Sequence, residues 1–228
     1  MIELSLSPTA SLLLAFVALA FCAEAVRRAR WDAPLRDHLG WAFATAVVLL
    51  AHRMNFTLAS GVSLQYLGAA FLALLLGYPR ALVSMTIVFA VGPWLPNAAA
   101  PAASVALVDV VGAWGLRTLL GAVLPIWTMW LVVSACRRWL PRNLFVFLLG
   151  CGLFGVFFAC AVQVLATVAI TALVAPDLPP GFFEDVVPYA LLLASGEAWL
   201  EGMLTTLLVV YAPGSVRLFD EAFYLSRR

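Results

Sequence analysis

Residues 143–174, NLFVFLLGCGLFGVFFACAVQVLATVAITALV, form a long apolar stretch with no charged side chain. This stretch exceeds the roughly 20 apolar residues that a helix needs to cross the hydrocarbon of a bilayer. The whole chain has the same character, because 64% of its 228 residues are hydrophobic and 11% are charged. A soluble domain covers its surface with charge, so this composition indicates an integral membrane protein.

Seven apolar segments divide the chain, and clusters of Pro, Gly or Arg bound them. They cover residues 9–26, 38–53, 63–78, 81–95, 105–136, 143–174 and 187–211. Their continuous apolarity differs from the alternating pattern of a membrane β-barrel, so we predict helices and no strands. The sequence therefore predicts an all-α protein, in which residues 1–228 form a single bundle of about seven transmembrane helices.

The lengths of these segments predict irregularities. The third and fourth segments are short, and Pro79 and Arg80 divide them. The fifth and sixth are too long for a perpendicular crossing. For these two we expect tilt, a kink near Pro125 or a re-entrant start around 105–115.

A stripe of small residues in the sixth segment predicts close helix packing. Cys151, Gly155 and Ala159 recur every four residues, which lets another helix approach closely. Gln163 continues the same face. Its side chain is therefore expected to form a hydrogen bond to a neighbouring helix.

The arginines predict how the bundle is oriented. If the seven segments cross in turn, eleven of the thirteen arginines fall on one side, after the first, third, fifth and seventh segments. The opposite side carries Glu3 and the acidic turn 177–185. Because cytoplasmic loops are enriched in basic residues, we predict an outside N-terminus and a cytoplasmic C-terminus. Arg27 and Arg28 follow the first apolar segment, so it is expected to be a true helix and not a cleaved signal.

The remaining motifs exclude several classes of function. No nucleotide-binding loop, dinucleotide fingerprint or hydrolase motif is present in the sequence. We therefore expect no enzyme and no cofactor, and any ATP hydrolysis must come from a partner subunit. The four cysteines have no metal-binding spacing and are expected to be small buried side chains: Cys22, Cys136, Cys151 and Cys160.

Ionisable residues inside the apolar segments are costly and therefore informative. They are Asp109, Arg117, Glu197 and Glu201. The last two are four residues apart, so a helix presents both carboxylates on one face. Since two like charges repel, we expect a proton or a cation beside them, with Arg117 or Arg53 as the neighbour. Two interpretations stay open: a buried ion pair that fixes helix register, and a polar pathway or coupling point.

Residues 52–68, HRMNFTLASGVSLQYLG, are unusually polar for this chain. The stretch 55–89, NFTLASGVSLQYLGAAFLALLLGYPRALVSMTIVF, resembles the conserved block of the membrane substrate-binding subunits of energy-coupling-factor transporters for cobalt and nickel. The positions in register with that family are Asn55, Phe56, Gly61, Ser63, Leu67, Gly68 and Gly77. GEAWLEGMLTTLLVVY, residues 196–211, is similar to the family's last helix, and the tail 213–225 resembles that of a diverged branch.

The resemblance implies a subunit of the bacterial inner membrane that works with a transmembrane coupling protein and cytoplasmic ATPase subunits. In the family, a Met-His N-terminus and a His in the loop hold the metal. Here Ile2 and Gln65 occupy those positions, and a carboxamide is a poor ligand for nickel or cobalt. His52 and Met54 are other donors near the loop, whereas His38 is expected on the opposite, arginine-rich side.

The candidate substrate-binding residues are therefore His52, Asn55, Ser63 and Gln65. They suit either a transition metal ion or a small organic molecule that amides and hydroxyls hold by hydrogen bonds. A second hypothesis is an accessory or structural membrane subunit of a larger complex, with no transport role. A membrane enzyme is not favoured, because no pair of nucleophile and base is visible, and no nucleic-acid partner is expected.

Overall fold

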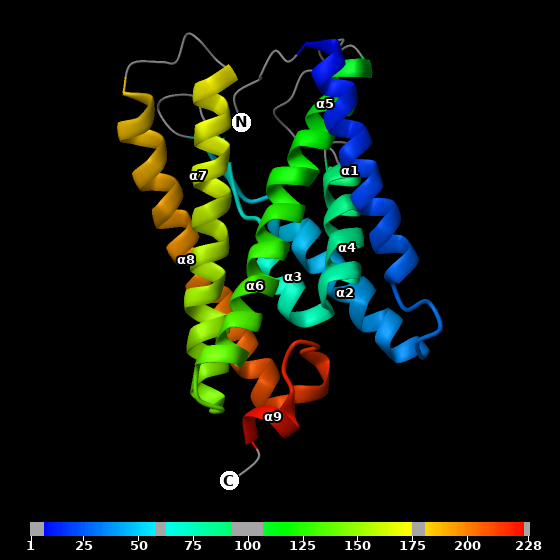
Figure 1. The fold of residues 1–228 in the computed structure, drawn as a ribbon, viewed down its shortest axis with the longest axis vertical. Coiled ribbons are helices and arrows are strands. Elements are labelled where there is room, and N and C mark those ends of the chain that lie inside the picture. Colours follow the sequence, from blue (N-terminus) through cyan, green and yellow to red (C-terminus); the bar gives the residue numbers. More distant parts are fainter. Residues whose placement is uncertain (1–6, 58–62, 93–106, 175–180, 226–228) are drawn as a thin grey trace.

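The computed structural model describes residues 7–57, 63–92, 107–174 and 181–225. They form a helical bundle with one small hairpin of two strands (Figure 1). The elements are α1 (Pro8–Arg28), α2 (Leu35–Ala51), β1 (Asn55–Thr57), β2 (Ser63–Gln65), α3 (Ala69–Leu76), α4 (Tyr78–Val91), α5 (Leu107–Thr118), η2 (Leu119–Val123), α6 (Leu124–Trp139), η3 (Val146–Gly155), α7 (Val156–Val174), α8 (Phe182–Tyr211), η4 (Pro213–Ser215) and α9 (Glu221–Leu225).

Within the described residues, four helical stretches are long and apolar enough to cross a membrane: Pro8–Arg28, Val110–Trp139, Val146–Val174 and Phe182–Tyr211. Their outward faces carry large apolar side chains, such as Phe16, which is 74% exposed, and Leu173, which is 85% exposed. Lipid accommodates such faces, whereas water does not. Helices α2 and α4 are shorter, at 17 and 14 residues.

The third predicted span, residues 63–78, is wrong as a transmembrane helix. Its first residues form β2, which pairs antiparallel with β1 so that Asn55 lies opposite Gln65. The helix that follows, α3, has eight residues and rises about 12 Å, less than half of a hydrocarbon core of about 30 Å. The prediction of no strands is also wrong, because apolar periodicity says little about strands of three residues.

Two glycines with left-handed backbone bound the half-helix α3. Gly68, at φ +72°, precedes it, and Gly77, at φ +75°, joins it to α4. Glycine adopts this conformation without steric cost. A Cβ atom on Gly68 would also lie 2.9 Å from Cγ1 of Val48 on α2. The chain can therefore enter the bundle at mid-height as α3, reverse at Gly77 and return as α4 (Figure 1).

Both long predicted segments contain π-helical turns. The turn η2 lies between α5 and α6 and ends directly before Leu124 and Pro125. Proline has no N–H to donate to a carbonyl of the preceding turn, so the regular helical hydrogen bonds cannot continue through it. The fifth segment therefore has a π-helical turn directly before Pro125, the position where a kink was one of the predicted alternatives. In the sixth segment, η3 runs continuously into α7.

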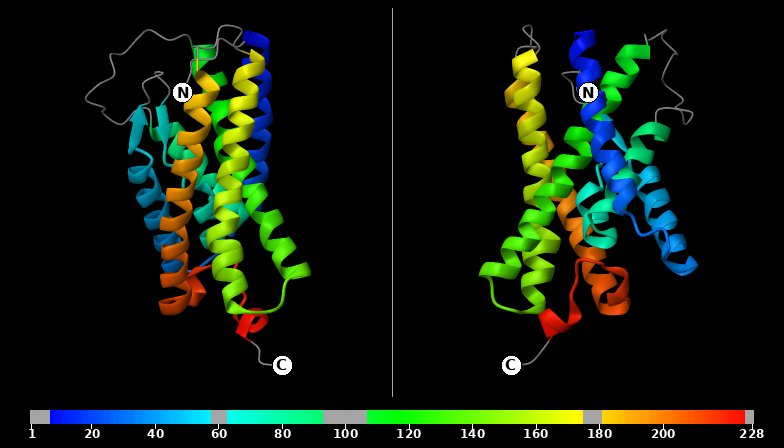
Figure 2. Two further views of the ribbon diagram at one scale, coloured as in Figure 1. Left: turned by 90° about the vertical axis from the view of Figure 1, so that its left-hand side faces the viewer. Right: turned by 45° about the vertical axis from the view of Figure 1, so that its right-hand side comes forward.

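Glycines also allow α1 and α5 to pack closely. A Cβ atom on Gly112 would lie 2.5 Å from Cβ of Ser11, and one on Gly115 would lie 2.7 Å from the backbone nitrogen of Ala15. Figure 2 shows the two helices crossing side by side. Their backbones come this near because neither glycine carries a side chain.

The small-residue stripe of the sixth segment is buried as predicted. Cys151, Gly155 and Ala159 all lie inside the bundle, and a Cβ atom on Gly155 would lie 2.9 Å from Cγ1 of Val132 on α6. The expected bond from Gln163 to another helix is wrong. Its Nε2 donates to Oγ1 of Thr167, one turn along the same helix, at 3.3 Å.

Successive segments run in alternating directions, so the predicted sorting of the arginines agrees with the bundle (Figure 1). The end of α1, the corner between α3 and α4, the end of α6 and the residues after α8 gather at one end, which we call the arginine-rich end. There Arg28 forms a salt bridge with Glu24 at 2.5 Å. Which end faces the cytoplasm stays a prediction.

The C-terminal tail is part of this end. The backbone N–H groups of Arg217 and Leu218 donate to the carbonyls of Leu75 and Leu74 at 3.0 and 3.1 Å. They satisfy acceptors that the last turn of α3 cannot satisfy itself. The rings of Phe219 and Tyr224 stack at 5.8 Å between centroids. The tail therefore caps the half-helix from below.

Candidate functional site

The loop predicted to bind substrate folds back onto its own first residue. Nδ1 of His52 lies 2.8 Å from the carbonyl oxygen of Tyr66, and the N–H of Tyr66 donates to the carbonyl of Met54 at 3.5 Å. Together with the backbone pairing of Asn55 and Gln65, these contacts bring the two ends of the loop together. The side chains of Asn55 and Ser63 lie outside the described part of the structure, and Gln65 is half-buried.

The ring of His52 has a defined orientation. A carbonyl oxygen only accepts hydrogen bonds, so Nδ1 is the protonated nitrogen and Nε2 carries the lone pair. The edge of the ring packs against Phe89 of α4, with 5.4 Å between the centroids. The same geometry leaves Nε2 in the form that binds metals.

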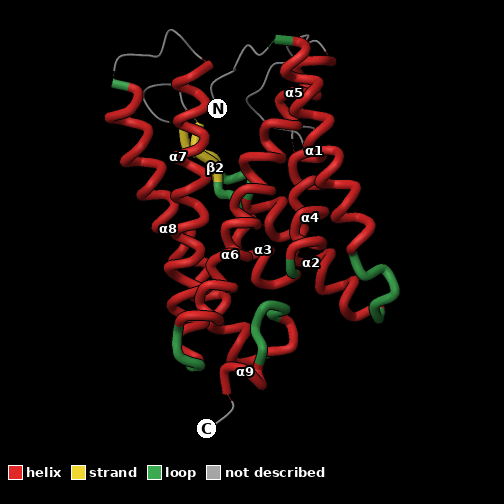
Figure 3. Tube along the Cα trace, in the orientation of Figure 1, coloured by secondary structure: helices red, strands yellow, loops and turns green. Residues whose placement is uncertain are grey.

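The two predicted carboxylates of α8 anchor the end of this loop. Oε1 of Glu197 accepts a hydrogen bond from the backbone N–H of Leu67 at 3.0 Å. Oε1 of Glu201 accepts one from the hydroxyl of Tyr66, also at 3.0 Å. Glu197 is 5% exposed and Glu201 is fully buried. The one-turn spacing predicted for the pair thus matches two consecutive residues of the loop. Figure 3 shows the two short strands, in yellow, leading through a short loop into the bundle.

The half-helix α3 points its N-terminus at the same carboxylates. Backbone groups of Gly68 and Phe71, at the start of α3, interact with Glu197 and Glu201 respectively. The first N–H groups of a helix have no partner within it, and the helix dipole places partial positive charge there. Two carboxyl groups at this position therefore supply acceptors to the donors at the start of the helix.

The second oxygens of the two carboxylates differ in their surroundings. The thiol of Cys160 on α7 lies 3.6 Å from Oε2 of Glu197 and donates to it. Oε2 of Glu201 and Oγ1 of Thr205, one turn further along α8, are buried and have no hydrogen-bond partner among the described residues. The carboxylate cluster is therefore only partly satisfied, and its unsatisfied atoms lie toward Thr205.

The expected arginine neighbour of the carboxylates is wrong for Arg117. In the described part of the chain Arg117 forms no salt bridge, and its Nε has no hydrogen-bond partner there. Arg53 is half-buried just after α2. Asp109 lies in the first turn of α5, and its side chain is outside the described part of the structure.

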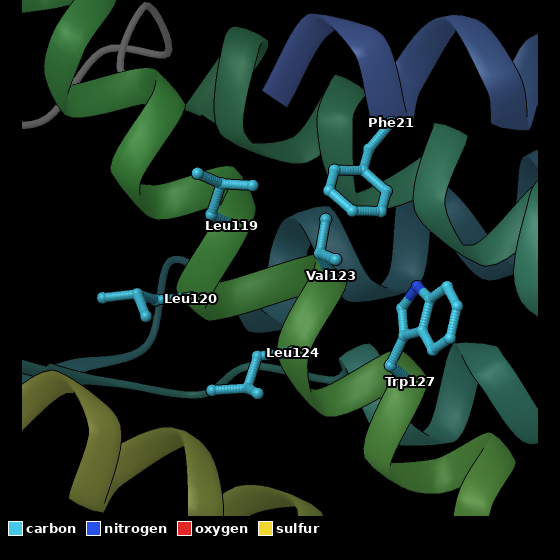
Figure 4. Close-up of a pocket in the computed structure, with 6 residues that line it drawn as sticks. All are labelled: Phe21, Leu119, Leu120, Val123, Leu124 and Trp127. Carbon is cyan, nitrogen blue, oxygen red and sulfur yellow. The ribbon is translucent and has the colours of Figure 1, made fainter. Parts of the chain in front are cut away.

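In the described part of the chain, no group of three or more His, Cys, Asp or Glu side chains is arranged so that it could hold a metal ion. An apolar groove of about 390 Å³ lies beside η2, away from the carboxylates (Figure 4). Its lining residues are Phe21, Leu119, Leu120, Val123, Leu124 and Trp127.

Sequence reasoning missed two participants in the site. Tyr66 was a position without an assigned role, although a phenol beside Gln65 in an apolar chain is a signal for a buried hydrogen bond. Cys160 was expected to be a buried cysteine, and all four cysteines are indeed buried and free. Its contact with Glu197 spans 37 residues, and no spacing rule could reveal it.

The chain matches one known protein family. The family model of the cobalt uptake substrate-specific transmembrane region matches residues 1–215. The chain belongs to this family. Its members are membrane components of cobalt uptake complexes and work with partner subunits, so the chain is a multi-pass membrane protein of transporter type. No curated protein and no solved structure matches it.

Proposed function

We propose that the chain is the substrate-binding membrane subunit of an energy-coupling-factor type importer in a bacterial inner membrane. Membership of the cobalt uptake family supports this role. In the proposed orientation the arginine-rich end faces the cytoplasm, following the usual charge bias of membrane proteins. The seven apolar segments then place the N-terminus outside. A transmembrane coupling protein and two cytoplasmic ATPases would supply the energy.

The anchoring of the loop to α8 is the observation that carries the proposal. A plain turn between helices needs no buried carboxylates, yet Glu197 and Glu201 hold Leu67 and Tyr66 in place. Each buried carboxylate is costly unless it is well hydrogen-bonded. Burying two carboxyl groups to hold a loop is expected where the position of that loop matters for binding. His52 fixes the other end of the same loop.

The substrate of the family is a metal ion, and His52 is the residue here that offers an imidazole near the loop. Its Nε2 could bind nickel or cobalt, both of which favour imidazole nitrogen. Ile2 and Gln65 replace the two histidines that the resemblance implies. If they abolish metal binding, the remaining amides and hydroxyls suit a small organic molecule.

Elemental analysis of the purified protein tests the metal arm of the proposal. The protein is measured with and without added nickel, cobalt, zinc and copper, alongside His52→Ala and His38→Ala. His38 is the matched control, because its Nε2 lies 3.2 Å from the carbonyl of Trp31 near the arginine-rich end. Stoichiometric metal that is lost in His52→Ala alone supports a metal site. A blank for every metal, or equal loss in both variants, refutes it.

The accessory role is the second candidate, and Gln65 at the ligand position favours it. The two functions differ in the partners that they require. Recovery with a coupling protein and an ATPase pair supports transport. Stoichiometric recovery with another membrane complex, together with no effect of Gln65→Ala on any uptake, supports the accessory role.

A further inference from the structure

A small cavity at the arginine-rich end is lined by four arginines from three separate parts of the chain. Its volume is about 110 Å³. Arg28 and Arg30 come from the end of α1, Arg80 from the first turn of α4, and Arg217 from the tail after α8. This space exceeds what one water molecule needs and suits a small oxyanion. Neither the proposed transport role nor the loop requires such a cavity.

Arg80 is the centre of this cluster. Its side chain is 4% exposed, and its guanidinium lies over the ring of Trp41 at 5.1 Å. Nη2 donates to the carbonyl of Arg30 at 2.6 Å. Nε is buried and has no hydrogen-bond partner among the described residues. A buried guanidinium with an unused donor calls for an anion, because an uncompensated buried charge is destabilising.

The charges around the cavity do not balance locally. Arg28 has a carboxylate partner in Glu24. Burial lowers the pKa of Arg217, and the charges of Arg30 and Arg80 lower it further, while Asp37 acts in the opposite direction and more weakly. Arg217 therefore sits in a field that two other arginines dominate. A bound anion would relieve this repulsion.

The backbone at the cavity also favours an anion. Pro79 and Arg80, which line it, lie in the first turn of α4, a helix of 14 residues. The dipole of a helix favours negative charge at its N-terminus. Helix α4 begins directly after Gly77, and the side chain of Arg217 passes over this glycine, where a Cβ atom would lie 3.4 Å from Cδ of Arg217.

We propose that this cavity binds a phosphate oxyanion, held by the guanidiniums of Arg30, Arg80 and Arg217. Guanidinium forks match the oxygens of phosphate and bind them through paired hydrogen bonds. Inorganic phosphate and the headgroup of an acidic phospholipid share this chemistry. The cavity lies at the arginine-rich end, between the end of α1, the start of α4 and the tail after α8, so both sources are candidates.

The test uses the full chain and two exposed arginine variants. Arg217→Gln removes one lining guanidinium, and Arg138→Gln removes an exposed arginine of the same end that does not line the cavity. Thermal unfolding in neutral detergent is followed against inorganic phosphate, with sodium chloride at matched ionic strength. In parallel, unfolding is compared in nanodiscs of phosphatidylglycerol and of phosphatidylcholine. A ligand that binds the folded state raises its melting temperature.

We expect phosphate or phosphatidylglycerol to raise the melting temperature of the parent chain and of Arg138→Gln. In Arg217→Gln the concentration needed for the same rise should increase at least tenfold. A response to inorganic phosphate identifies the free anion, and a response to phosphatidylglycerol alone identifies the lipid headgroup. No response beyond chloride and phosphatidylcholine overturns the proposal. Equal weakening in both variants also overturns it, because it indicates diffuse charge attraction and not a site.

Discussion

The bond between Tyr66 and Glu201 allows a direct measurement of how firmly the loop is anchored. Tyr66→Phe removes one hydroxyl and leaves the ring, so the shape of the side chain is almost unchanged. The lost bond is 3.0 Å long, and its acceptor is fully buried. A typical hydrogen bond contributes about 0.5–1.5 kcal/mol in soluble proteins and one to a charged group about 1.5–3 kcal/mol, whereas side-chain bonds between membrane helices average about 0.6 kcal/mol.

We therefore expect Tyr66→Phe to lower the free energy of unfolding by about 1–2 kcal/mol. This corresponds to a roughly five- to thirty-fold change in the unfolding equilibrium constant. The assay is reversible unfolding in mixed micelles with an increasing fraction of denaturing detergent. Tyr211→Phe is the matched control, because Tyr211 ends the same helix α8 and is 82% exposed. Its effect should stay within about 0.5 kcal/mol.

A double-mutant cycle with Glu201→Met separates the bond from other effects of the substitution. Where the acceptor is absent, Tyr66→Phe should have little further effect, because two apolar partners leave no polar group unsatisfied. The reasoning is refuted if Tyr66→Phe is as mild as Tyr211→Phe. It is equally refuted if the full loss persists in the Glu201→Met background.

Three further predictions concern the backbone and the tail. Gly68→Ala should cost about 2 kcal/mol or more in unfolding free energy, from its positive φ and its contact with α2, whereas Gly196→Ala, with open space around it, should be neutral or stabilising by up to about 1 kcal/mol. Gly115→Ala should cost about 1–3 kcal/mol by forcing α1 away from α5, and distance measurements between spin labels on these helices should show the separation. Burial raises the pKa of Tyr224 to about 12, so stability from the tail should be full below pH 10 and fall as the pH rises toward 12. Tyrosinate absorbance should show this late titration, and Tyr224→Phe should remove it.

Hydropathy predicted most of the bundle because it reports which residues lipid tolerates. Six of the seven predicted segments correspond to helical stretches, and the arginines gather at one end as their spacing indicates. The short length of α3 was not predicted, because a count of apolar residues does not distinguish a helix that crosses the membrane from one that ends at mid-height. Gly68 and Gly77 decide its bounds through backbone conformation, which hydropathy does not measure.

The candidate site was predicted as two unrelated features that the structure joins. The loop residues came from a family resemblance, and the carboxylates came from the cost of charge in lipid. Their contacts connect residues 130 and 135 positions apart, and pairings at such distances follow from packing alone. The compensation expected for the carboxylates was a proton or a cation, with an arginine as the neighbour, because pairing of charges is the simplest compensation. Backbone N–H groups and a phenol supply it instead.

The half-helix α3 and the two carboxyl groups of α8 compensate each other's cost of burial. A helix that begins inside the bundle leaves its first N–H groups without water to bind, and each such group costs several kcal/mol in hydrocarbon. Two carboxylates one turn apart on α8 are also costly, unless donors and positive dipole face them. Each feature alone would destabilise the fold, but together they compensate one another: Glu197 and Glu201 accept hydrogen bonds from Leu67 and Tyr66, directly before α3, and interact with backbone groups of Gly68 and Phe71 at its start. Because this contact joins the loop to the middle of α8, any displacement of the loop by a bound substrate must disturb the hydrogen bonds of that helix's buried carboxylates.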